Sequence, residues 1–150
     1  MTINSKINIG DNQLFFLISQ DLNWYYENCK TPDINKLLSI RDHLAVMSYN
    51  LASIAADLKL DYNTNYYIRK IETARSKQGF IARGKSAAQS ETDSIVAMSD
   101  HFKNELEAEA NSYKVDLLLK QVNKILDAMN QRIAFARSEE YTSRKQENNV

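Results

Sequence analysis

The residues of this sequence best suited to chemistry are tyrosines and basic side chains close together in its middle. Tyr66 and Tyr67 begin a segment, residues 66–90, that holds six Lys/Arg and one Asp/Glu, and Tyr62 lies just before it. Basic side chains neutralise phosphates, and aromatic faces stack on unpaired bases without demanding a particular base sequence. The pattern predicts a site for single-stranded nucleic acid. Its candidate residues are Tyr62, Tyr66, Arg69, Lys70, Arg75 and Lys77.

An acidic segment follows directly and gives a second explanation of the same charges. Residues 91–116 hold seven Asp/Glu and two Lys/Arg, and the formal net charge of the chain is +0. The basic residues could therefore form a solvated face that pairs with the acidic segment. A net charge of zero also argues against tight nucleic-acid binding by an isolated monomer, because no overall positive field steers the ligand. The sequence leaves both interpretations open.

No catalytic or metal-binding pattern accompanies these charges. His43 and His101 lack a partner at a metal-ligand spacing, and the alternation of Glu105, Glu107 and Glu109 spreads them over two faces of a helix. Zinc spacings, phosphate-binding glycine loops and nucleophile motifs are absent from the sequence. Cys29 is the single cysteine, which excludes an internal disulfide and indicates a reducing compartment. We expect a protein that is not an enzyme and needs no cofactor or metal.

The elements that must position these residues are helices. Three glycines and one proline in 150 residues are too few for the turns of a β-rich domain. Apolar residues recur at alternating spacings of three and four, the pattern of a helix that packs along another helix. The first of these seams comprises Leu37, Ile40, Leu44, Met47, Leu51, Ile54 and Leu58. The second comprises Val115, Leu118, Val122, Ile125 and Met129.

Helix boundaries are predicted from capping and breaking residues. A first helix should run from about Leu14 to Cys29, and Thr31-Pro32-Asp33 is typical of a helix start with a capping threonine. The next helix should end near Gly84, running through or breaking at the poor helix formers 61–65. Small polar residues predict a flexible turn over 85–93. Another helix should follow from Ile95.

The predicted organisation is a single helical domain over residues 12–138, with an N-terminal arm over 1–11 and a disordered tail over 139–150. An unbroken helix from Asp33 to Arg83 would be about 75 Å long at about 1.5 Å per residue, too long for a compact globule. The predicted fold is therefore all-α, an elongated helical bundle or hairpin with long coiled-coil-like helices that forms a homo-oligomer. The chain has no apolar run near the roughly 20 residues that span a bilayer, so we expect a soluble protein without a membrane partner.

Two segments resemble a known family. Leu58-Lys59-Leu60-Asp61-Tyr62 is similar to the basic Leu-Asp-Tyr motif of the UvsY recombination mediators of T-even-like phages, and residues 125–135 are similar to that family's C-terminal helix. Together they cover about a tenth of the chain. Lys59 takes the place of the motif's arginine, which adds it to the candidate nucleic-acid residues. The family's other basic position falls on Asp57, a departure from the motif.

The resemblance implies a function. Members are small helical proteins that assemble into rings, bind single-stranded DNA, and help load a RecA-like recombinase onto strands coated by single-strand-binding protein. By analogy this chain is expected to act in the cytoplasm of a phage's host cell. The resemblance also places part of an oligomer interface on the C-terminal helix, at Leu126, Met129, Ile133 and Phe135.

Two other functions fit the same sequence features. An oligomeric scaffold or virion component would have these helices without binding single strands. A small adaptor or inhibitor of a host protein would use the acidic segment as its contact surface.

Overall fold

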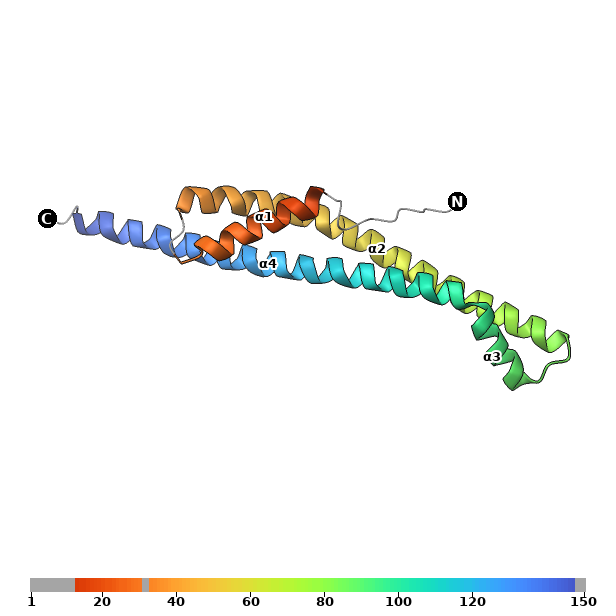
Figure 1. Ribbon diagram of the computed structural model, residues 1–150. Coiled ribbons are helices and arrows are strands. Elements are labelled where there is room, and N and C mark those ends of the chain that lie inside the picture. The colour runs from red at the N-terminus through yellow and green to blue at the C-terminus, as the bar shows by residue number, and fades with distance from the viewer. Residues whose placement is uncertain (1–12, 31–32, 148–150) are drawn as a thin grey trace. The chain divides into compact units, whose positions relative to one another are not determined.

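The chain folds into helices throughout the part that the structure describes. The computed structural model describes residues 13–30 and 33–147, with side chains described as far as Thr142. The described part contains no strand, which confirms the all-α prediction. The helices, shown in Figure 1, are α1 (Gln13–Asn28), α2 (Ile34–Ala82), α3 (Ala87–Ala97) and α4 (Ser99–Glu147).

The chain divides into two compact units. Unit 1 comprises Met1–Ala52 and Leu118–Val150, and unit 2 comprises Ser53–Leu117. Both long helices contribute to both units. The predicted arm over 1–11 lies outside the described residues. Helix α4 continues to Glu147, so residues 139–147 of the predicted tail are helical.

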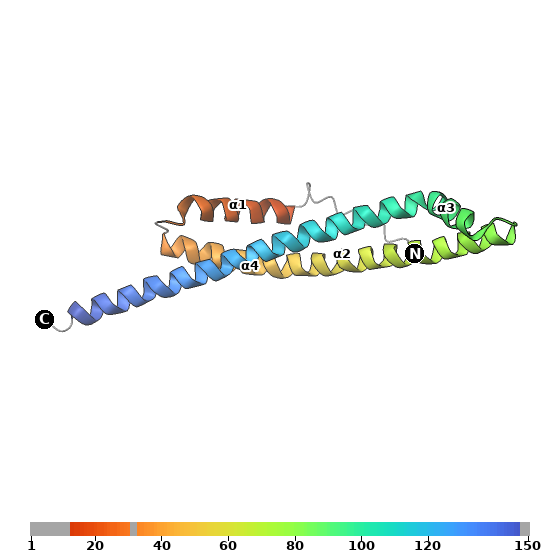
Figure 2. The ribbon, with the colours of Figure 1, turned by 90° about the horizontal axis from the view of Figure 1, so that it is seen from below.

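Unit 1 holds most of the buried apolar residues. Helix α1 lies beside the N-terminal part of α2 and the C-terminal part of α4 (Figures 1 and 2), joined to α2 by Asp21–His43 and to α4 by Tyr26–Gln121. Both predicted seams supply this core, which follows from their helical spacing. Its buried residues are Phe15, Ile18, Leu22, Tyr25, Leu37, Ile40, Leu44, Met47, Leu51, Val122, Ile125, Met129 and Ile133.

Helix α2 begins with a cap that differs from the predicted one. The Asp33 carboxylate accepts hydrogen bonds from the backbone N–H groups of Asn35 (2.8 Å) and Lys36 (3.2 Å), so Asp33 is the N-cap. The threonine predicted to cap, residue 31, lies outside the described residues. A carboxylate at this position also interacts favourably with the helix dipole.

Helix α2 does not break at its poor helix formers. The side chains of Thr64 and Asn65 hydrogen bond to the carbonyl oxygens four residues earlier, at 2.8 and 2.9 Å, and so stay within the helical path. The helix ends as predicted near Gly84, which has φ 84°. Lys85 N–H donates to Phe80 O and Gly84 N–H to Ile81 O, a pairing that satisfies the last carbonyl groups.

The predicted turn over 85–93 is wrong, because most of it forms α3. The Ser86 hydroxyl accepts a hydrogen bond from the N–H of Gln89 at 3.3 Å and starts the helix. Small side chains then allow a close approach to the rest of unit 2, where Ser90 and Ser94 are fully buried. The helix predicted to start at Ile95 is interrupted at Met98, between α3 and α4.

Unit 2 has a much smaller core than unit 1. Its buried apolar residues are Leu58, Ala108 and Val115, accompanied by the buried serines Ser90, Ser94 and Ser112. Many of its larger apolar side chains are exposed, a feature that bears on function below.

Candidate nucleic-acid interface

A row of tyrosines on α2 forms the centre of the candidate site, entirely within unit 2. The ring centroids of Tyr62 and Tyr66 lie 6.4 Å apart, and those of Tyr66 and Tyr67 lie 5.4 Å apart. The spacing of four residues brings Tyr62 and Tyr66 onto one side of the helix. Tyr67 is exposed, and the other two are half-buried.

Two exposed lysines lie over these rings. Lys59 Nζ is 4.9 Å from the ring centroid of Tyr62, and Lys70 Nζ is 4.5 Å from that of Tyr66. Both are cation–π contacts. They extend the tyrosine row in both directions along α2, so we call Lys59, Tyr62, Tyr66, Tyr67 and Lys70 the aromatic–lysine row.

Arg69 belongs to a different environment. Its guanidinium forms a bidentate pair with the Glu105 carboxylate of α4, with Nη2 to Oε1 at 3.2 Å, and it also lies over the rings of Tyr66 and Phe102. The side chains of Arg69 and Glu105 are only 17% and 12% exposed. The hydrogen bond from Arg69 to Glu105 raises the pKa of Arg69 further. Arg69 therefore connects α2 to α4 rather than facing solvent.

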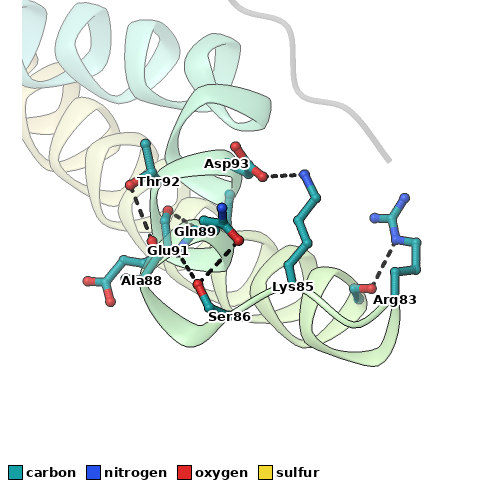
Figure 3. Close-up of polar contacts among 10 residues, drawn as sticks. Arg83, Lys85, Ser86, Ala88, Gln89, Glu91, Thr92 and Asp93 are labelled. Carbon is teal, nitrogen blue, oxygen red and sulfur yellow. Dashed lines mark hydrogen bonds and ion pairs between the residues drawn. The ribbon is translucent and has the colours of Figure 1, made fainter.

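Other basic residues also pair with carboxylates. Lys77 Nζ binds Glu91 at 2.9 Å, and Arg75 Nη1 binds Glu72 at 2.6 Å on the same helix. The hydrogen bond from Lys77, and then its charge, lower the pKa of Glu91. Lys85 pairs with Asp93 across the loop that joins α2 and α3 (Figure 3).

These pairs bear on the two interpretations of the basic segment, as a nucleic-acid site or as a partner of the acidic segment. Arg69, Lys77 and Lys85 each bind a carboxylate of the acidic segment, as the pairing interpretation expects. The candidates Lys59, Tyr62, Tyr66 and Lys70 instead come together in the aromatic–lysine row. Tyr67 also belongs to this row and was not among the candidates chosen from spacing. Glu91 and Glu105 were not foreseen as specific partners, because helical spacing does not tell which carboxylate faces which cation.

Two cavities adjoin these residues. One, of about 320 Å³, lies between α2, α3 and the start of α4, and Arg69, Lys77, Glu91 and Phe102 are among its lining residues. The other, of about 380 Å³, is lined at one end by Lys59 and Tyr62 and at the other by α4 residues. Those α4 residues are Glu109, Ser112, Tyr113 and Asp116.

The residues predicted for the oligomer interface have unequal surroundings. Met129 and Ile133 are buried within the core of unit 1, so they already have packing partners in the same chain. Leu126 is half-buried, and Phe135 is exposed. Phe135 is the member of this set most accessible to a second molecule.

Neither histidine points to a metal site. His43 Nδ1 lies 2.7 Å from the Asp21 carboxylate in unit 1, a contact between α1 and α2. Within the described residues, no cluster of three or more His, Cys, Asp or Glu side chains could hold a metal ion. In the same part of the chain, no helix combines the length and apolar character needed to cross a membrane.

Comparison with other proteins adds no relative: no family profile, curated protein or solved structure matches this chain.

Proposed function

We propose that this protein binds single-stranded DNA through the aromatic–lysine row of α2 and acts without catalysis as an accessory factor in recombination. The proposal rests on the observation that two exposed ammonium groups and three tyrosine rings lie together on one short stretch of α2. Ammonium groups suit phosphates, and stacking of bases on aromatic rings contributes about 1–3 kcal/mol per base without sequence preference. The stacking favours single strands over duplex DNA, because only unpaired bases expose their faces to the rings.

The proposed site is smaller than the set of residues expected from spacing. Arg69 and Lys77 already bind carboxylates, and phosphate would have to compete with these carboxylates for them. Lys59 and Lys70 contact rings instead, so their charges remain available to phosphates. A contribution from Arg75 is limited by its pair with Glu72.

The proposed cellular role extends this binding activity. By the resemblance at residues 58–62 and 125–135, the protein would help load a RecA-like recombinase onto strands coated by single-strand-binding protein, in the host-cell cytoplasm. We propose that it does so as a homo-oligomer built from coiled-coil-like helices. Repetition of weak sites around an oligomer raises the overall affinity without any new contact.

Fluorescence anisotropy with a labelled, unstructured oligonucleotide tests the proposed site. The double substitution Lys59→Gln/Lys70→Gln should weaken binding at least tenfold and reduce its salt dependence, because fewer counterions are released. The matched control is Lys36→Gln/Lys124→Gln, which removes two exposed lysines of unit 1. Equal binding by both variants would refute the site, and no binding by the wild type at tens of micromolar in low salt would refute the function.

A second candidate function is that of an oligomeric scaffold or an adaptor for another protein. It is favoured by apolar side chains that unit 2 leaves exposed on both long helices. At about 3.6 residues per turn, those of α2 lie on one side, away from Leu58 and Arg69. Exposed apolar groups at this density mark protein contacts. They are Leu60, Tyr67, Ile68, Ile71 and Ile81 on α2 and Leu106, Tyr113 and Leu117 on α4.

A further inference from the structure

The cavity between α2 and α3 has the composition of an anion site. It measures about 320 Å³, which lies at the lower end of the range for small-molecule pockets. Arg69, Lys70 and Lys77 contribute three positive charges to its lining, and Glu91 contributes one negative charge. Phe102 adds an aromatic wall on which the Arg69 guanidinium lies, 4.6 Å from the ring centroid. We call this space the α2–α3 cavity.

The two carboxylates near this cavity are held very differently. Glu105, which binds Arg69, is largely buried and makes a bidentate pair. Glu91, which binds Lys77 by one contact of 2.9 Å, has a side chain that is 64% exposed. A single exposed ion pair exchanges readily with other anions, whereas a buried bidentate pair does not. Glu91 is therefore the exchangeable anion of the cavity.

Helix α3, which carries Glu91, is attached without an apolar core. Its buried residues are Ser90 and Ser94, while Ile95 and Val96 are exposed. The hydroxyl oxygens of Ser90 and Thr73 are buried and have no hydrogen-bond partner among the described residues. Thr73 is also part of the cavity lining. Buried hydroxyls normally have hydrogen-bond partners. Because these two lack them, the packing of α3 against α2 is open to local rearrangement.

From these observations we propose that the α2–α3 cavity binds a phosphate group, and that Glu91 occupies its place on Lys77 until the ligand arrives. Arg69 and Lys70 supply further positive charge. A small movement of α3 would also let the hydroxyls of Thr73 and Ser90 form hydrogen bonds with the bound phosphate. The phosphate can come from a phosphodiester of single-stranded DNA or from a free nucleotide. In the first case the inference rests on the proposed function and adds a second contact site to the aromatic–lysine row.

Backbone NMR on the full-length protein tests the cavity directly. Inorganic phosphate, deoxythymidine monophosphate and an unstructured oligothymidine are titrated separately, and the amide signals of residues 73–77 and 87–97, which exclude the aromatic–lysine row, are followed. We expect at least one of the three to shift these signals saturably. Glu91→Gln should tighten that binding several-fold by removing the competing carboxylate, and Lys77→Gln should weaken it at least tenfold. Glu107→Gln, an exposed change on α4 outside the cavity lining, should have no effect.

The three ligands separate the possible outcomes. A response to the oligothymidine alone identifies a nucleic-acid phosphodiester, and a response to the mononucleotide without the oligothymidine identifies a free nucleotide. If the oligothymidine binds through Lys59 and Lys70 while the cavity signals stay unchanged, the proposed function stands and this inference is wrong. The inference is also overturned if no ligand at millimolar concentration affects residues 73–77 or 87–97 of the wild type, a result that does not depend on how any variant folds.

Discussion

Arg69 and Lys70 are sequence neighbours whose surroundings give them different roles. Arg69 turns toward α4 and is held by a largely buried carboxylate, so removing either partner would leave a charge with little water around it. Lys70 is exposed and lies over the ring of Tyr66. A cation over an aromatic face keeps most of its contact with solvent and with approaching anions. The same residue class thus provides a structural connection at one position and a binding group at the next.

The pair between Lys77 and Glu91 predicts a measurable titration. The hydrogen bond from Lys77 lowers the pKa of Glu91, so protonation of Glu91 is harder in the folded protein than in the unfolded chain. Its contribution to the attachment of α3 is present above the ordinary glutamate pKa of about 4.3 and is lost as the pH falls through the lowered pKa. Lys77 faces Glu91 from α2, Arg69 and Lys70 line the same cavity, and Asp93 lies on α3 itself.

Carboxyl NMR of the full-length protein would measure this titration. We expect the pKa of Glu91 to lie below the ordinary glutamate value, and Lys77→Gln to bring it back toward that value. If Glu91 titrates at the ordinary glutamate value in the wild type, then the ion pair with Lys77 does not persist in solution.

At the scale of helices, apolar spacing fixes which side of each helix packs. Leu44 is fully buried in α2, whereas Val46, two residues later, is 64% exposed. Leu44→Ala should lower the free energy of unfolding by about 2–5 kcal/mol, because it removes buried methyl groups and leaves a cavity. Val46→Ala should change it by less than about 0.5 kcal/mol. Urea unfolding followed by circular dichroism makes the comparison, and a similar effect of both substitutions would contradict the assigned core.

The same physical reasoning explains where sequence analysis succeeds and fails. The seam from Leu37 to Leu51 and the end of α2 at Gly84 were predictable, because periodicity and a left-handed glycine are local signals. Helix α3 was not, since its serines favour turns unless a cap and a close packing surface stabilise a helix. The aromatic–lysine row follows from helical spacing, whereas its separation from Arg69 depends on the position of Glu105, thirty-six residues away.

At the scale of the whole molecule, the neutral net charge and the exposed apolar groups have to be considered together. Five basic residues of unit 2 pair with carboxylates of the same chain, so a monomer offers DNA few free cations; they are Arg69, Arg75, Lys77, Lys85 and Lys103. Long-range attraction of a polyanion to such a surface is weak. An oligomer would repeat the aromatic–lysine row and would bury apolar side chains that are otherwise in water. Self-association would therefore both strengthen DNA binding and remove the exposed apolar side chains from water.

Self-association through unit 2 is therefore the prediction that concerns the molecule as a whole. Ile71 and Leu106 are exposed apolar residues of α2 and α4, so Ile71→Glu/Leu106→Glu should break an interface without disturbing either core. Light scattering at micromolar concentration should give a multiple of 17.3 kDa for the wild type and a lower mass for this variant. Ser39→Glu/Asn104→Glu places the same charges at exposed polar positions, Ser39 in the unit 1 part of α2 and Asn104 on the side of α4 away from Leu106, and should keep the wild-type mass. A wild-type protein that remains a monomer, or a variant that keeps its mass with unchanged helicity, would exclude these faces as the oligomer interface.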